Sequence, residues 1–120
     1  MTMRYLMLVC EDVQDSATPP TQADRDGAPD VEAWWNAANA SGNYVMGDRL
    51  RPPGEAMAVR VRGGETLVSQ GPFAEGGELV LGFDVLECES AEEAVRIATG
   101  HPMAHEGVLE LRALWPMGEG

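Results

Sequence analysis

The sequence contains no lysine, and this absence excludes every mechanism that needs one. A Schiff-base enzyme and a P-loop nucleotide hydrolase each use a lysine ammonium group, so neither class fits this chain. Only two histidines and two cysteines are present, and their positions show no zinc-ligand spacing. We therefore expect no metal and no cofactor.

Long apolar runs are also missing. None approaches the roughly 20 residues that a membrane-spanning helix needs. The apolar start of the chain is followed by Cys10, Glu11 and Asp12, not by a small-residue cleavage site. A first strand is therefore expected in place of a signal peptide, and a cytoplasmic location without membrane attachment follows.

Basic residues are few: 8 of them stand against 20 acidic residues, which gives a net charge of −12. An electrostatic field of this sign repels phosphate groups, so we expect no direct binding to nucleic acid or to an anionic membrane. The 120 residues, 44% of them hydrophobic, are typical of one soluble domain covering residues 1–120. Cys10 and Cys88 fall at ends of predicted strands on opposite sides of the sheet, so we expect reduced, semi-buried thiols.

Hydrophobic patterns and turn residues predict six strands. They cover residues 3–10, 43–47, 56–62, 65–70, 79–88 and 108–115. The third and fourth strands form a hairpin, because Gly63 and Gly64 tolerate the positive φ that a two-residue turn requires. Residues 11–29 are polar, hold three prolines and show no periodicity, so we expect a loop there.

Two helices complete the pattern. The first covers residues 30–40, and its apolar residues recur at the spacing of one buried stripe: Val31, Trp34, Trp35 and Ala38. The second begins at residue 90 with a capping box formed by Ser90 and Glu93, and Gly100 ends it.

The order of these elements predicts the fold class. Strand, helix and strand are followed by an inserted hairpin and then by strand, helix and strand, which is the α+β, ferredoxin-like βαββαβ arrangement. Right-handed crossovers place the four main strands in the order four-one-three-two, antiparallel, with both helices on one face. The other face is also apolar, so we expect a second copy of the chain to cover it in a homodimer.

The loop within residues 69–83, SQGPFAEGGELVLGF, is the expected functional region because Gly-Pro and Gly-Gly pairs bend its backbone between two strands. Topology places this loop at the same end of the sheet as His101, a candidate general acid or base that Glu75 or Glu78 would orient. The competing interpretation is that His101 satisfies a carbonyl group at a helix end. Expected ligand-binding residues are Gln70, Pro72 and Phe73 of the loop, together with Arg49 and Arg60, although either arginine could instead pair with nearby acids.

Asp84 is the polar exception in an apolar strand. We expect it to pair with Arg4 or Arg112 across strands, in a structural role.

Several segments taken together resemble the YCII-related superfamily, and within it the group named for an Asp-Gly-Pro-Phe motif. MRYLMLVCED is similar to the family's opening strand, and GDRLRPPGEAMAVR to its stretch from Gly and Leu through Pro to an Ala-x-x-Val-Arg strand. SQGPFAEGGELVLGF is similar to the signature loop, and SAEEAVRIATGHP and VLELRAL to the second helix and last strand. The resemblance covers nearly the whole chain and implies a dimeric α/β-barrel of ferredoxin-like protomers.

The resemblance leaves the activity open. It implies a His–Asp catalytic pair of the kind proposed for the superfamily and, for this group, association with bacterial sigma-factor systems. This sequence departs from the motif, because Gln70 stands in place of its Asp, Gly76 and Gly77 stand in place of Thr-Lys, and the first helix has no His. Two hypotheses follow: a small-ligand-binding or regulatory module, or a small-molecule enzyme that uses His101 with Glu75 or Glu78.

Overall fold

The computed structural model describes residues 1–13, 15–71 and 79–119. Its eleven elements, in chain order, are β1 (Met3–Glu11), α1 (Gln22–Asp26), α2 (Val31–Ala40), β2 (Tyr44–Arg49), η1 (Pro53–Glu55), β3 (Met57–Arg62), β4 (Glu65–Gln70), β5 (Leu79–Cys88), α3 (Ala91–Thr99), α4 (Pro102–Glu106) and β6 (Val108–Ala113). No helix among the described residues is both long enough and apolar enough to cross a membrane.

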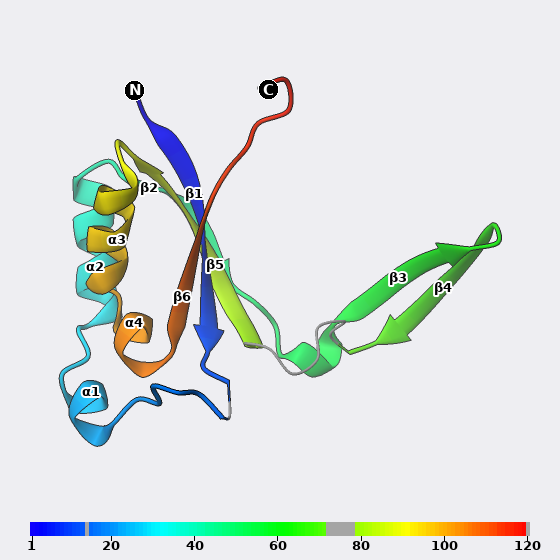
Figure 1. Cartoon of the computed structure of the whole chain (residues 1–120), viewed down its shortest axis with the longest axis horizontal. Helices are drawn as coiled ribbons and strands as arrows, with labels where there is room; N and C mark the ends of the chain where they lie inside the picture. Colours follow the sequence, from blue (N-terminus) through cyan, green and yellow to red (C-terminus); the bar gives the residue numbers. More distant parts are fainter. Residues whose placement is uncertain (14, 72–78, 120) are drawn as a thin grey trace.

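Four strands form the main sheet in the order β2-β5-β1-β6, and all neighbouring pairs are antiparallel. This is the predicted order four-one-three-two, counted without the hairpin strands. The helices lie on one side of the sheet, and β3 and β4 form a separate two-stranded sheet that projects to the other side (Figure 1). The ferredoxin-like α+β fold is confirmed.

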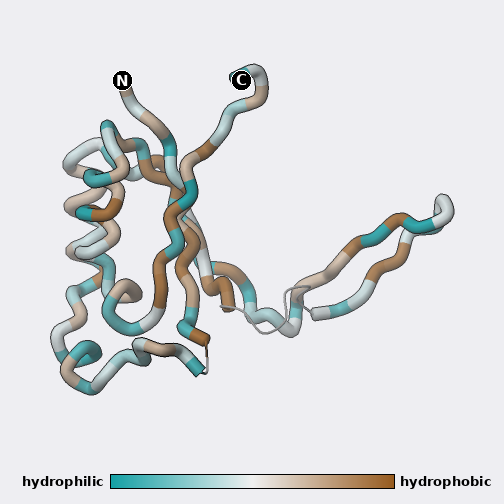
Figure 2. Tube along the Cα trace, viewed as in Figure 1, coloured by the Kyte–Doolittle hydropathy of each residue, from teal (hydrophilic) through white to brown (hydrophobic). Residues whose placement is uncertain are grey.

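The core lies between the sheet and the helices. Met7, Leu86 and Cys88 are its fully buried large side chains, and they point from the central strands toward α2 and α3. Trp34 of α2 and the alanines Ala38, Ala94 and Ala98 pack against them. Figure 2 shows hydrophobic segments along the central strands, and also on the projecting hairpin.

Cys10 and Cys88 form no disulfide with each other, as predicted, but both are buried and not semi-buried. Cys88 lies opposite Met3 at the start of β1, whereas Cys10 lies opposite Val80 near the other end of the same strand pair. The two thiols therefore sit at opposite ends of the sheet.

Two short helices were not predicted. α1 lies inside the segment expected to be a loop, where Thr21 and Asp24 form a capping box through reciprocal bonds of 3.1 and 2.8 Å. α4 follows α3 directly. Each has five residues and none of them is buried, so neither produces the apolar periodicity from which helices are predicted.

The predicted buried stripe of α2 is only partly correct. Trp34 and Ala38 are buried, but Val31 and Trp35 are about half exposed. Trp35 instead lies edge-on against Tyr44, with ring centroids 6.0 Å apart. The stripe spans a wider arc than the contact between α2 and the sheet, so its outer members stay in solvent.

Candidate functional site

His101 follows the end of α3 and is the N-cap residue of α4. Its side chain is 6% exposed, and its ring packs edge-on against Trp34 with centroids 4.8 Å apart. The Nδ1 atom accepts a hydrogen bond from the Met103 N–H at 3.0 Å. His101 therefore satisfies an N–H donor at a helix start, and the expectation that it satisfies a carbonyl group at a helix end is wrong.

The environment of His101 favours the neutral ring. Burial lowers its pKa below 6.5, because desolvation disfavours the charged imidazolium. Since Nδ1 accepts a hydrogen bond, the proton of the neutral ring is on Nε2. Within the described part of the chain, no carboxylate acts on this pKa.

This arrangement predicts a pH dependence of stability. A histidine whose pKa is lowered by folding contributes stability that is complete above pH 6.5 and is lost as the pH falls through the folded-state value, by at most about 1.4 kcal/mol per pH unit. His101→Asn keeps a capping oxygen but does not titrate, so its unfolding free energy between pH 7 and pH 5 should fall less than that of the wild type. Urea unfolding at three pH values measures the difference. If the unfolding free energies of the two proteins fall equally between pH 7 and pH 5, the lowered pKa of His101 would be contradicted.

Three of the other predicted site residues fall within the described residues: Arg49, Arg60 and Gln70. Arg49 ends β2 at the same end of the sheet as α4, where it lies opposite Gly82 (Figure 1). Arg60 lies on β3 in the projecting hairpin, away from His101, and Gln70 lies at the base of that hairpin, exposed and opposite Met57. Pro72, Phe73, Glu75 and Glu78 lie outside the described residues.

The expectation that Asp84 pairs with Arg4 or Arg112 is wrong. Asp84 lies opposite Met7 on the helix-covered face, whereas both arginines are on the other face. Arg4 pairs there with Glu87, Nε to Oε1 3.5 Å. The alternation of the strand therefore separates Asp84 from both arginines.

Asp84 instead belongs to a chain of polar groups beside α2. Its carboxylate is near enough to the Tyr44 hydroxyl, and that hydroxyl to the Trp35 side chain, for these neighbours to act on the pKa values of Asp84 and Tyr44. Burial raises the pKa of Asp84, the Tyr44 hydroxyl opposes this rise, and the charge of Asp48 adds to it. Burial also raises the pKa of the Tyr44 phenol, and the Asp84 charge adds to that effect.

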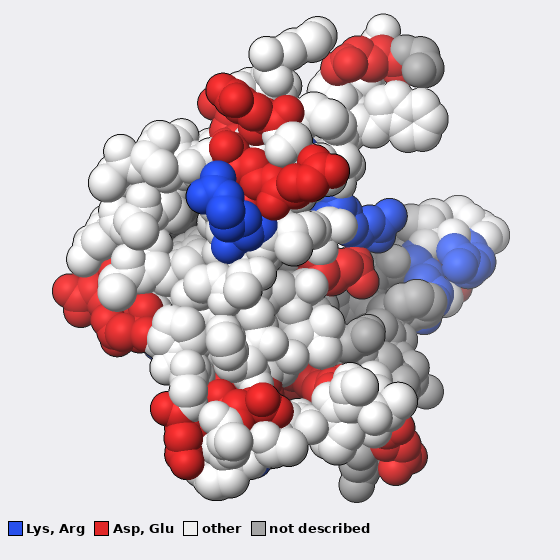
Figure 3. All heavy atoms as spheres, turned by 60° about the vertical axis from the view of Figure 1, so that its left-hand side comes forward, with Lys and Arg blue, Asp and Glu red and all other residues white. Residues whose placement is uncertain are grey.

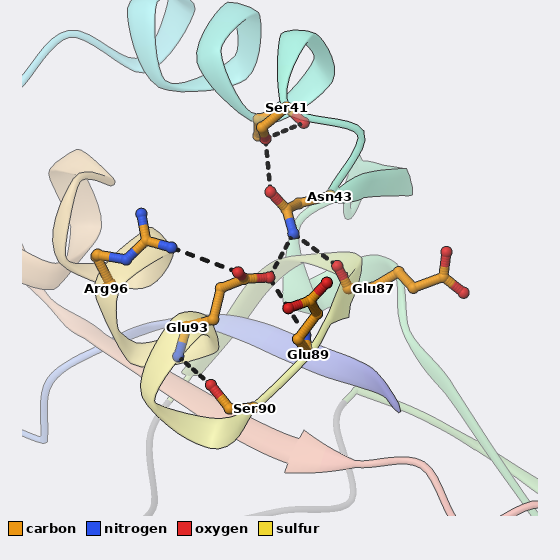
Figure 4. A network of polar contacts seen from close by, with 8 residues as sticks. Ser41, Asn43, Glu87, Glu89, Ser90, Glu93 and Arg96 are labelled. Carbon is orange, nitrogen blue, oxygen red and sulfur yellow. Dashed lines mark hydrogen bonds and ion pairs between the residues drawn. The ribbon is translucent and has the colours of Figure 1, made fainter. Parts of the chain in front are cut away.

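A network of hydrogen bonds joins the end of α2 to the start of α3 (Figure 4). The Asn43 side-chain amide donates to Glu93 Oε1 at 2.8 Å and to the Glu87 carbonyl at 2.7 Å, while its Oδ1 accepts from Ser41 at 2.6 Å. The second Glu93 oxygen lies 3.5 Å from Arg96 Nη2. Asn43 thus connects β2, β5 and α3, and it fixes one end of the space between the helices.

That space is a cleft of about 760 Å³ along α2 and α3. Small and apolar side chains form its walls, including Ala33, Ala37 and Ile97, with Trp34 beneath them. Its charged lining residues are Asp30, Glu87, Glu89, Glu93 and Arg96. The volume lies within the range of about 300–1,000 Å³ that small-molecule sites occupy.

The cleft has a negative rim. Three acidic side chains, Asp30, Glu89 and Glu93, and the guanidinium group of Arg96 line it, and Arg96 is paired with Glu93. Glu87 contributes its backbone carbonyl, because its side chain pairs with Arg4 on the other face of the sheet. Figure 3 shows acidic side chains in the majority on the side that carries the helices, with their largest group at the upper end. Among the described residues, no group of three or more His, Cys, Asp or Glu side chains is arranged to hold a metal ion.

Sequence patterns did not reveal this cleft. They predicted a capping box of Ser90 and Glu93, of which the structure confirms one half: Ser90 Oγ accepts from the Glu93 N–H at 3.1 Å. The Glu93 side chain instead accepts from the Glu89 N–H at 3.3 Å and from Asn43, a contact that the sequence did not indicate. Asn43 and Glu93 are 50 residues apart. The available signal was the series of alanines on the first helix, because small side chains there leave room beside a second helix.

The fold and the cleft describe a small α+β domain built to bury one face of a sheet under two helices. The YCII-related domain model matches residues 3–118, so the chain belongs to the YCII-related family. The chain is also similar to the uncharacterised protein R00369 of Rhizobium meliloti (strain 1021), at 32% identity over 121 residues covering 98% of each chain.

Proposed function

We propose that this YCII-related protein is a small-ligand-binding module that acts as a homodimer, and that its ligand is an organic cation held between α2 and α3. The single observation that supports this is the cleft of about 760 Å³, which is lined by apolar side chains and by about as many polar and acidic ones. A concave site of this size that combines apolar contacts with fixed polar groups suits a small molecule.

The charges of the cleft favour a cationic ligand. Glu93 is already paired with Arg96, and Glu87 with Arg4. Asp30 caps α2 through one oxygen, which accepts from the Ala33 N–H at 3.0 Å. The exposed Glu89 carboxylate therefore remains to meet an ammonium or guanidinium group, while the ligand's apolar part would lie over Trp34 and the alanines.

Binding is favoured over catalysis by the state of His101. Its Nδ1 already accepts a backbone hydrogen bond, and burial keeps its ring neutral. A module of this kind would act by changing its stability or its contacts when the ligand binds. Beside a sigma factor, as the family resemblance implies, that change would be the regulatory signal.

The face of the sheet without helices supports the homodimer. Register places Leu6 opposite Val85 and Leu8 opposite Phe83, and all four side chains are half-buried. Polar residues frame this apolar centre: Glu110 and Arg112 on β6, and Asp48 on β2. An apolar centre with a polar rim is the usual form of a protein–protein interface.

A thermal-shift comparison tests the ligand class. We expect the phenethylammonium cation to raise the melting temperature and its anionic counterpart, phenylacetate, to have no effect, because only ligands that bind the folded state stabilise it. Glu89→Gln should weaken cation binding by about 3- to 10-fold, which is about 1 kcal/mol. Glu92→Gln is the matched control, since Glu92 lies on α3 but does not line the cleft. Equal responses to cation and anion, or equal losses in both variants, would contradict the proposal.

A further inference from the structure

The hairpin formed by β3 and β4 carries an exposed apolar face. Val59 lies opposite Val68, and Met57 and Val61 share the same face of β3. These four side chains are 73% exposed at Met57, 64% at Val59, 59% at Val61 and 60% at Val68. Four large apolar side chains on one face of a two-stranded sheet form a contiguous patch that solvent does not favour.

A hairpin of this kind does not hold itself together well in water. Two isolated strands are marginally stable, and independent stability needs further strands or a packing partner. Among the described strands, β3 and β4 pair with each other and with no strand of the main sheet. At the base of the hairpin, the Gly71 N–H donates to the Ala56 carbonyl at 2.7 Å, so the two strands leave the body side by side.

The direction of the hairpin shows where such a partner would lie. It projects from the side of the main sheet opposite the helices (Figure 1). A second copy of the chain placed over the apolar centre at Leu6, Leu8, Phe83 and Val85 would occupy that same side.

Charge supports the same partner. Residues 57–70 carry two arginines and one glutamate, whereas the rest of the chain carries 6 arginines and 19 acidic residues. A weakly basic segment is therefore attached to a strongly acidic body. Arg60 and Arg62 alternate with Val59 and Val61 and lie on the other face of the hairpin, so the charge complementarity is between the hairpin as a whole and the acidic body of another copy.

We infer that the β3–β4 hairpin is a dimerisation arm, which packs its apolar face of Met57, Val59, Val61 and Val68 against the second copy of the chain. This inference rests on the homodimer proposed above and adds to it a contact outside the main sheet. Each protomer contributes one arm, so the two-fold symmetry of a homodimer makes the contact twice.

Two substitutions on neighbouring residues test the arm. Val68→Asn places an amide on its apolar face, and Leu67→Asn places the same amide on its opposite face. Both positions are exposed and belong to the same strand, so their effects on the fold of one protomer should match. Sedimentation equilibrium of the full-length variants gives the dimer dissociation constant. We expect Val68→Asn to raise it by at least about tenfold and Leu67→Asn by less than about threefold.

Hydrogen exchange provides a second readout that needs no substitution. The amides of β3 and β4 should exchange more slowly at a protein concentration well above the dissociation constant than at one well below it. If Val68→Asn and Leu67→Asn both dimerise as tightly as the wild type, and the amides of β3 and β4 are not protected at high concentration, the inference about the arm would be overturned while the homodimer proposal would stand. A wild-type protein that stays monomeric would overturn both.

Discussion

Trp34→Ala should lower the free energy of unfolding by about 3–5 kcal/mol, the range measured for large aromatic side chains removed from a core. Trp34 is 8% exposed, and its indole N–H donates to the Ile97 carbonyl at 2.8 Å. Its ring also packs against His101 and Tyr44, with centroids 4.8 and 6.2 Å away. The substitution therefore opens a cavity and removes one donor to the Ile97 carbonyl, which still accepts from the Gly100 N–H at 3.2 Å.

The neighbouring tryptophan is the matched control. Trp35 is 49% exposed, so Trp35→Ala should cost less than about 1.5 kcal/mol. Urea unfolding followed by circular dichroism measures both variants. Equal losses would contradict the assignment of Trp34, and not Trp35, to the core.

Leu8→Asp should raise the dimer dissociation constant by more than about 100-fold. In the proposed homodimer, this substitution places one carboxylate from each protomer in the apolar centre of the interface, where a charge without a partner is costly. Analytical ultracentrifugation at micromolar concentration measures the change.

Val95→Asp is the control for that experiment. Val95 is 56% exposed on α3, on the helix-bearing side of the sheet, so the same change of side chain should leave the dimer intact. A wild-type protein that is monomeric at micromolar concentration would contradict the homodimer. So would a Leu8→Asp variant that remains as dimeric as Val95→Asp.

The strand order and the positions of α2 and α3 could be predicted because they depend on long apolar patterns and on the few topologies that connect them. Side-chain contacts could not be predicted in the same way. The sequence predicts that Asp84 pairs with an arginine across strands, but the strand register shows that Asp84 shares a face with Met7. The register shifts between Val9 and Cys10 and between Tyr44 and Met46 leave no clear mark in the sequence.

The candidate site shows the same limit. Counting strands placed the loop that follows Gln70 at the same end of the sheet as His101. The strands β3 and β4 before it form a separate two-stranded sheet, so Arg60 lies outside the main sheet. His101 was recognised as the notable histidine of the chain, but its capping bond to Met103 depends on a five-residue helix without a periodic signal. The cleft depends on Asn43 and Glu93, which only the folded chain brings together.

The most direct test of the proposed ligand site is a calorimetric titration of phenethylammonium into three proteins. Ala37 lines the cleft, whereas Ala40 is an exposed residue of the same helix outside it, so Ala37→Trp fills the cleft and Ala40→Trp does not. We expect saturable binding to the wild type and to Ala40→Trp, and a loss of at least about tenfold in affinity for Ala37→Trp. Binding that survives in Ala37→Trp, or a wild-type protein that binds no cation, would contradict the proposal that the cleft between α2 and α3 is a site for organic cations.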